Sequence, residues 1–168
     1  ILFLFAGHET TTNLITMASL AMMRDEGLRQ AFLALDTPDA IECAVEEFLR
    51  HDGPTPVMVR VATEDHVLDG QQIKAGDKVY PVIASANRDP DVFADPDRID
   101  LARDPNRHMT FGFGTHFCLG APLARMEAQI ALPALHRRFP HMTLAGTPDW
   151  ADGVTLRGPA SLPVRLAS

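Results

Sequence analysis

The sequence is poor in the features that stabilise secreted and membrane-embedded proteins. It contains two cysteines, Cys43 and Cys118, which are too few for a disulfide framework. No long apolar run is present, and the opening run of residues 1–5 is too short for a membrane span or a signal peptide. The net charge of −7 argues against a nucleic-acid surface as the main partner. We therefore expect a globular protein of a reducing compartment, the cytoplasm, without a membrane or nucleic-acid partner.

The amino-terminal stretch also lacks an initiator methionine and a helix-capping residue, so we expect the chain to begin inside a helix, as a fragment does. Residues 1–24 are apolar on nearly every face, which is typical of a helix buried in a larger protein. His8 and Glu9 begin a zinc-protease motif, but its second histidine is replaced by Thr12. This mismatch excludes that metal site.

Hydrophobic periodicity predicts three further helices, over 25–35, from the Thr37 cap to about Arg50, and over 121–138. The residues expected to face the core from the last helix are apolar and lie at helical spacing: Leu119, Leu123, Met126, Ile130 and Ala134. Short strands are expected over 57–62, 67–68, 71–73, 78–82, 142–144, 154–156 and 162–165. The predicted fold class is mainly α with small β-sheets (α+β).

The stretch from Phe111 to Gly120 presents one cysteine in a glycine-rich loop, directly before the last predicted helix. Its glycines allow the backbone to bend close to a flat object. The positive end of the helix dipole lies beside Cys118 and favours a thiolate. Such a thiolate can be a nucleophile, a zinc ligand or the axial ligand of a haem iron. The alternative is a buried, inert cysteine in a tight turn.

The order of residues in this loop resembles the haem-binding signature of the cytochrome P450 family. The positions that the resemblance assigns to cofactor binding are Phe111, Gly112, Gly114, His116, Cys118 and Gly120. It implies that Cys118 is the axial ligand of the iron in haem b (iron protoporphyrin IX). Phe111 would shield the sulfur, and His116 would donate a hydrogen bond to a haem propionate.

The segment from Ala6 to Thr10 resembles the oxygen-binding part of the long central helix of the same family. The resemblance implies that small residues leave room above the iron and that the helix opens locally. Thr10 would then hydrogen-bond the oxygen species, while Glu9 would help to relay protons. The alternative for Thr10 is a hydroxyl bonded back to the carbonyl one turn earlier.

Glu47 and Arg50 lie at a spacing that lets them pair on one helix face. An exposed pair of this kind contributes less than about 1 kcal/mol. The resemblance implies instead that the pair is buried and locked to an arginine of a later irregular segment, where Arg103 stands. Such a triad has a structural role and no chemistry.

The resemblance also implies that Arg60 reaches a haem propionate from a strand. The apolar residues Ala6, Val57 and Met58 would line the substrate pocket, which favours an apolar substrate. Arg125 resembles a position that faces the electron donor, which implies an acidic ferredoxin as a partner. The alternative for Arg60 and Arg125 is an ordinary surface arginine.

Four matching segments in the right order cover the chain, so residues 1–168 are interpreted as the carboxyl-terminal part of a single cytochrome P450 domain. The resemblance implies a monooxygenase that uses dioxygen to hydroxylate a small organic substrate, with a ferredoxin-type redox partner and its reductase. Two alternatives remain. One is an inactive truncated fragment of that fold, and the other is a zinc-binding or structural module that uses Cys118 with His116 and His108.

Overall fold

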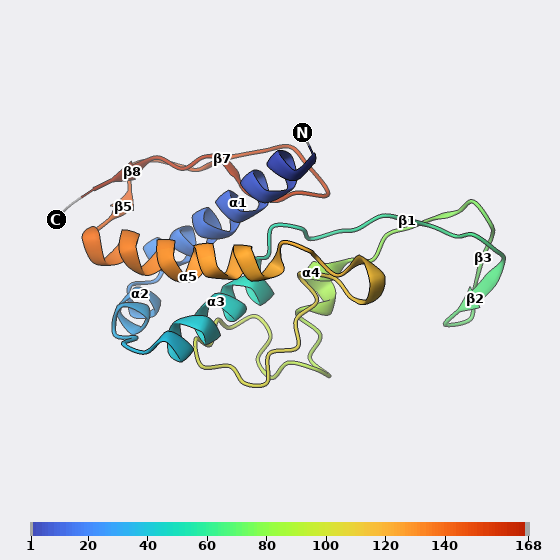
Figure 1. The fold of residues 1–168 in the computed structure, drawn as a ribbon, viewed down its shortest axis with the longest axis horizontal. Helices are drawn as coiled ribbons and strands as arrows, with labels where there is room; N and C mark the ends of the chain where they lie inside the picture. Colours follow the sequence, from blue (N-terminus) through green and yellow to red (C-terminus); the bar gives the residue numbers. More distant parts are fainter. Residues whose placement is uncertain (1, 167–168) are drawn as a thin grey trace.

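The computed structural model describes residues 2–166 and consists mainly of packed helices (Figure 1). The four longer helices are α1 (Leu2–Arg24), α2 (Glu26–Leu33), α3 (Pro38–Asp52) and α5 (Ala121–Arg138). Asp25 caps α2 by accepting a hydrogen bond from the Leu28 backbone N–H, and Thr37 caps α3 in the same way from Ala40. The predicted helices are therefore confirmed over the described residues, which leave out residue 1, and these caps set where α2 and α3 begin.

The core lies where α1, α2, α3 and α5 pack against one another. Its larger buried side chains are Leu14, Met22, Phe32, Val45, Phe48, Leu49 and Leu132. Each is at most 2% exposed. Burial of such side chains is the main source of stability for a helical body of this kind.

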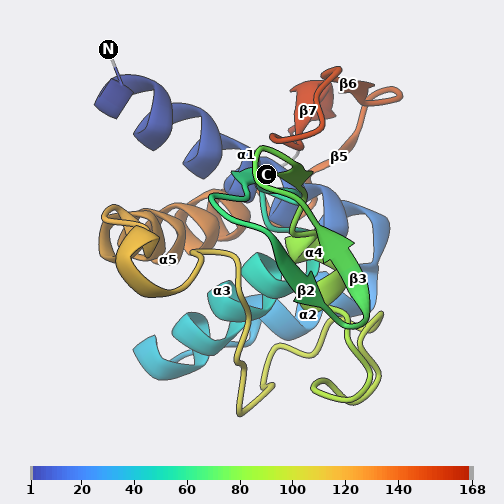
Figure 2. The same ribbon diagram turned by 90° about the vertical axis from the view of Figure 1, so that its right-hand side faces the viewer.

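The strands form four small antiparallel pairs. The pairs are β1 (Arg60–Val61) with β4 (Lys78–Val79), β2 (His66–Leu68) with β3 (Gln71–Ile73), β5 (Thr143–Leu144) with β8 (Val164–Arg165), and β6 (Asp149–Trp150) with β7 (Pro159–Ser161). The β2–β3 hairpin projects away from the helical body (Figures 1 and 2). Its turn places Gly70 at φ 76°, where glycine is favoured. These pairs confirm the prediction of small β-sheets.

The strand expected over 154–156 is wrong. Val154 is 70% exposed, and residues 151–158 are irregular between β6 and β7. An apolar run needs a neighbouring strand to bond with, and β6 pairs with β7 instead.

The prediction of which face of α5 is buried is also wrong. Leu119, Leu123, Met126, Ile130 and Ala134 are all exposed, with Leu119 at 84% and Ile130 at 65%. The residues that α5 buries are Ala121, Ala128, Leu132, Pro133 and His136. This helix is apolar on two faces, and the small alanine side chains allow close packing against α1 and α3.

The connection from α3 to α5 contains two short helices, α4 (Ile83–Ala86) and the 3₁₀ turn η1 (Gly114–His116). Between them, residues 87–113 form an irregular segment that runs beside α3 (Figure 1). Within residues 2–166, no helix combines the length and the apolar character needed to cross a membrane.

Candidate functional site

A cavity of about 540 Å³ brings together segments that are distant in the sequence. It is lined by α1, by the chain that leads into β1, and by the loop before α5. The predicted site residues on its wall are Ala6, Thr10, Met58, Arg60, Phe111, Gly112, His116 and Cys118. Four further predicted residues are not among its lining residues, namely Glu9, Val57, Gly114 and Gly120. The cavity is therefore the candidate site.

The loop before α5 has the backbone geometry of a tight cysteine holder. Gly112 has φ 76° and Gly114 has φ 71°, a conformation that side chains with a Cβ rarely adopt. The Cys118 backbone N–H donates a 2.9 Å hydrogen bond to the Phe111 carbonyl and closes the loop. Cys118 is exposed and precedes the first turn of α5, so its thiol lies on the cavity wall near the positive end of that helix.

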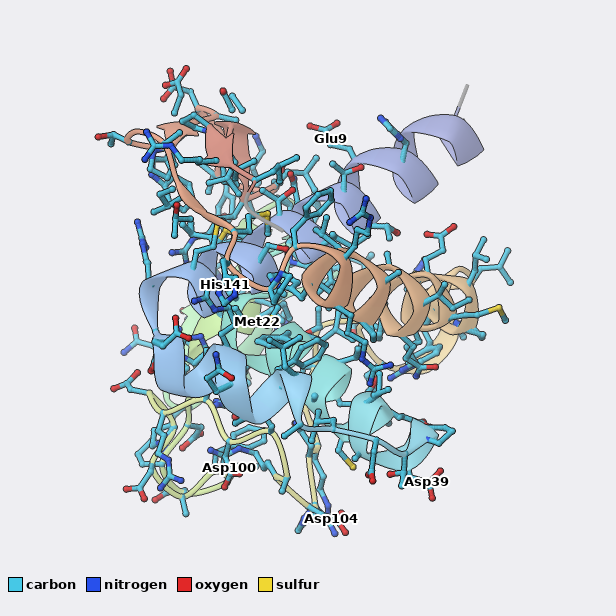
Figure 3. All side chains as sticks on the ribbon, turned by 90° about the vertical axis from the view of Figure 1, so that its left-hand side faces the viewer. Glu9, Met22, Asp39, Asp100, Asp104 and His141 are labelled. Carbon is cyan, nitrogen blue, oxygen red and sulfur yellow. The ribbon has the colours of Figure 1, made fainter. Side chains whose placement is uncertain are left out.

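Thr10 lies on α1, which forms another part of the cavity wall from the cysteine loop. Its hydroxyl donates a 2.7 Å hydrogen bond to the Ala6 carbonyl, which is the arrangement that the sequence left open as an alternative. α1 is continuous from Leu2 to Arg24, so the expected local opening of this helix is wrong. Thr10 nevertheless lines the cavity, whereas Glu9 is exposed and points away from the helical body (Figure 3).

Two polar side chains complete the cavity wall. Arg60 is exposed, and within residues 2–166 its guanidinium makes one hydrogen bond, from Nη1 to the Val59 carbonyl at 2.9 Å. His116 lies in η1 and is also exposed. Val57 is half-buried and forms a bridge with Val82 behind this region of the wall.

The donors of the cavity suit the haem that the resemblance implies. One wall carries a cysteine sulfur, which is a soft ligand for iron. Arg60 and His116 supply nitrogen donors for carboxylates at the edge of a flat group. The remaining wall is largely apolar, which excludes water from the centre of such a group.

The structure does not favour the zinc-binding alternative. In the part of the chain that the structure describes, no group of three or more His, Cys, Asp or Glu residues is arranged to hold a metal ion. His108, one of the expected ligands, instead lies with its Nε2 3.0 Å from Oε2 of Glu46. A structural zinc site needs four converging ligands, so Cys118 and His116 alone do not make one.

Glu47 lies at the centre of a buried ion-pair network behind the irregular segment. Arg50 donates to both of its carboxylate oxygens, at 2.8 and 2.9 Å, and Arg103 approaches the same oxygens at 3.1 Å. The side chains of Glu47 and Arg50 are 0% exposed. Although burial raises the pKa of Glu47, hydrogen bonds from Arg50 and the Asp100 backbone N–H hold it below its usual range.

A second network, centred on Glu46, was not predicted from the sequence. Arg125 donates two hydrogen bonds of 2.7 and 2.8 Å to the Glu46 carboxylate, and the guanidinium lies 4.5 Å from the centre of the Phe111 ring. Although burial raises the pKa of Glu46, hydrogen bonds from Arg125 and His108 lower it to about 2. Arg125 therefore binds a carboxylate of α3 while 27% of its side chain stays exposed, and its contact with an electron donor stays a prediction.

Comparison with known proteins identifies relatives over most of the chain. Residues 40–152 match the family model "Cytochrome P450". The polyketide biosynthesis cytochrome P450 PksS of Bacillus subtilis is 46% identical over 170 residues, which cover 99% of this chain and 42% of that protein. Mycinamicin IV hydroxylase/epoxidase of Micromonospora griseorubida is 46% identical over 168 residues, which cover 96% of this chain and 41% of that protein.

A solved structure has the same fold. CYP109E1 from Bacillus megaterium, in complex with testosterone, matches with a TM-score of 0.93 and 38% identity, covering 99% of this chain and 46% of that one. The chain thus spans less than half the length of the relatives that it matches.

Proposed function

Because the chain belongs to the cytochrome P450 family, we propose that it forms the haem-thiolate site of a monooxygenase, with Cys118 as the axial ligand of the iron. Members of this family bind haem b. The observation that carries the proposal is that Thr10, Arg60 and Cys118, from three distant segments, line one cavity. Bound haem supplies the activation of dioxygen and the transfer of one oxygen atom to an organic substrate.

The loop before α5 holds the cofactor from the cysteine side. Gly112 and Gly114 let the loop turn under a flat group, and Gly120 ends it, where an added Cβ would lie 3.9 Å from the Cys118 sulfur. Phe111 lines the same cavity as Cys118, and its proposed role is to shield the sulfur from water when the cofactor is bound. His116 and Arg60 bind the carboxylates and fix the orientation of the ring.

On the opposite side, α1 provides the groups that handle protons. The Thr10 hydroxyl proton is held at the Ala6 carbonyl, 2.7 Å away, and the hydroxyl oxygen is available to accept a hydrogen bond. Glu9 is exposed, so its carboxylate can exchange protons with the solvent. We assign Thr10, on the cavity wall, to hydrogen bonding within the cavity, and Glu9, outside the wall, to exchange of protons with the solvent.

The substrate that we propose is a small, apolar organic molecule. Ala6 and Met58 contribute apolar surface to the cavity, and Val57 lies directly beside Met58 in the chain. The relative CYP109E1 was solved with testosterone, which is itself largely apolar.

Electrons would come one at a time from a ferredoxin-type partner and its reductase. A working thiol at Cys118 favours the reducing cytoplasm.

We propose that residues 1–168 form the carboxyl-terminal part of a single cytochrome P450 domain. The coverage of less than half of each relative supports this extent. Exposed apolar side chains on α5, among them Leu123 and Ile130, are also typical of a face that packs against further protein. An inactive piece of the fold is the second candidate, favoured by the same exposed surface.

The proposal is tested by loading the protein with haem, reducing it, adding carbon monoxide and recording the difference spectrum. A red-shifted Soret band of the thiolate-ligated type should form and should be lost in Cys118→Ser. Cys43→Ser, which removes the other cysteine from a position on α3, should leave the band unchanged. The absence of haem uptake by the unsubstituted chain would favour the inactive fragment. Haem uptake with an unchanged band in Cys118→Ser would contradict the proposed ligand.

A further inference from the structure

Three separate segments meet behind the cysteine loop through one carboxylate. Glu46 projects from α3, Arg125 from α5, and His108 from the irregular segment that leads into the loop. The side chains are 19% exposed for Glu46, 27% for Arg125 and 3% for His108. A bidentate pair of this geometry, shielded from solvent, fixes both charges in place.

Phe111 separates this ion pair from the cavity. The ring faces the Arg125 guanidinium at 4.5 Å, and Phe111 lines the cavity, whereas Glu46, Arg125 and His108 do not. The Phe111 carbonyl accepts the hydrogen bond from the Cys118 backbone N–H. A displacement of Arg125 would therefore move the Phe111 side chain, and the hydrogen bond from Cys118 to the Phe111 carbonyl would transmit this movement to the cysteine.

Arg125 also lies close enough to Cys118 for a charge on the sulfur to act on it. Hydrogen bonding to Glu46 raises the pKa of Arg125, and a thiolate at Cys118 would act in the same direction with a smaller effect. A cation held beside a thiolate withdraws electron density from the sulfur, and the Glu46 carboxylate offsets much of that effect. The two charges thus act on the sulfur with opposite signs.

We propose that the Glu46–Arg125 pair is a positioning device that sets the electrostatic environment of the Cys118 sulfur, and with it the reduction potential of the iron that this sulfur holds. The inference rests on the proposed function, because it concerns the iron bound by Cys118. It also gives Arg125 a role other than docking of an acidic partner. Neither residue touches the substrate or the cofactor cavity, so both act through Phe111 and through their charges.

The sign of the effect follows from which charge is removed. Glu46→Gln leaves the Arg125 cation uncompensated, which stabilises the more negative ferrous state and raises the potential. Arg125→Met leaves the Glu46 anion in place and lowers the potential. The double variant removes both charges and should return the potential close to that of the unsubstituted protein.

The experiment is a spectroelectrochemical titration of the haem-loaded protein and its variants. We expect each single variant to change the ferric–ferrous equilibrium by about tenfold, which is ~59 mV for one electron, in opposite directions. Arg138→Met removes the same charge from the far end of α5 and should leave the potential unchanged. Arg125→Lys keeps the charge but loses the bidentate geometry, so it should lower stability with little change in potential.

Opposite shifts in the single variants, cancelling in the double variant, are the expected result. Equal potentials in all variants, or shifts in the same direction, would overturn the inference while the carbon monoxide spectrum still supported the proposed function. Failure of the unsubstituted protein to take up haem would overturn both. Circular dichroism of each variant shows whether it is folded, and the rise in potential expected for Glu46→Gln still tests the inference if Arg125→Met does not fold.

Discussion

Two adjacent glutamates of α3 lie in different environments. Glu47 is completely buried and accepts hydrogen bonds from Arg50, Arg103 and the irregular segment, whereas the Glu46 side chain keeps 19% of its surface exposed and pairs with Arg125. The first network joins α3 to residues 87–106, and the second joins α3 to His108, just before the cysteine loop, and to α5. One helix therefore supports the site from two directions, and the Glu47 network is the more deeply buried.

The Glu47 network stabilises a segment that has little regular secondary structure. Arg50 also donates to the backbone carbonyls of Asn87, Pro96 and Arg98, at 2.8, 2.8 and 3.0 Å. Buried carbonyl groups need such partners when no helix or sheet supplies them. Arg50 therefore fixes the segment at three points, and Arg103 donates a further hydrogen bond to the Ala94 carbonyl.

The largest effect that we predict is on the Glu47 network. Arg50→Met should lower the free energy of unfolding by about 3–5 kcal/mol, because it removes two hydrogen bonds from a buried carboxylate and one from each of three backbone carbonyls. Chemical denaturation followed by circular dichroism measures this loss. A decrease of less than ~1 kcal/mol in the free energy of unfolding would show that the network contributes no more than an exposed ion pair, and would contradict the prediction.

A smaller loss is expected at the neighbouring position. Glu46→Gln keeps the shape of the side chain but removes the charge, and Arg125 can turn to solvent because its side chain is 27% exposed. We predict a decrease of about 1–2 kcal/mol in the free energy of unfolding. Arg138→Met, on the same helix as Arg125, is the matched control and should change stability by less than about 0.5 kcal/mol. A loss in Glu46→Gln as large as in Arg50→Met would remove the distinction between the two networks.

The smallest predicted effect is a change in acid sensitivity. The pKa of Glu46 is about 2 in the folded protein and has an ordinary value of 4.5, so between these values the unfolded chain binds more protons. The contribution of Glu46 to stability is therefore complete above pH 4.5 and is lost as the pH falls toward about 2. Unfolding curves measured over this range should depend less on pH in Glu46→Gln. Equal slopes in the two proteins would contradict the lowered pKa.

Much of the fold could be predicted because local signals were strong. The Asp25 and Thr37 caps define where α2 and α3 begin, and the glycines of the cysteine loop adopt the positive φ angles that only such residues favour. The buried face of α5 could not be predicted from periodicity. Its two faces are both apolar, and the choice of Ala128 over Ile130 for the core depends on how closely α1 and α3 approach.

In the site too, contacts between residues close in the sequence could be predicted, and contacts between distant residues could not. The spacing of Glu47 and Arg50 predicted their pairing, because residues at that spacing are neighbours on a helix. The pairing of Glu46 with Arg125 joins residues 79 positions apart, and no local pattern connects them. The sequence left two roles open for the Thr10 hydroxyl, a hydrogen bond to the oxygen species or a hydrogen bond to the carbonyl one turn earlier. A threonine on a helix can make either bond, so the sequence alone could not decide between them.

In the proposed site, the Cys118 sulfur binds the iron of haem in this cavity. Iron X-ray absorption spectroscopy of the haem-loaded protein tests it directly, since it identifies the atoms bound to the metal. We predict one sulfur ligand in the unsubstituted protein and in Cys43→Ser, and none in Cys118→Ser. A sulfur ligand that persists in Cys118→Ser, or an iron bound only by nitrogen and oxygen in the unsubstituted protein, would show that Cys118 is not the axial ligand.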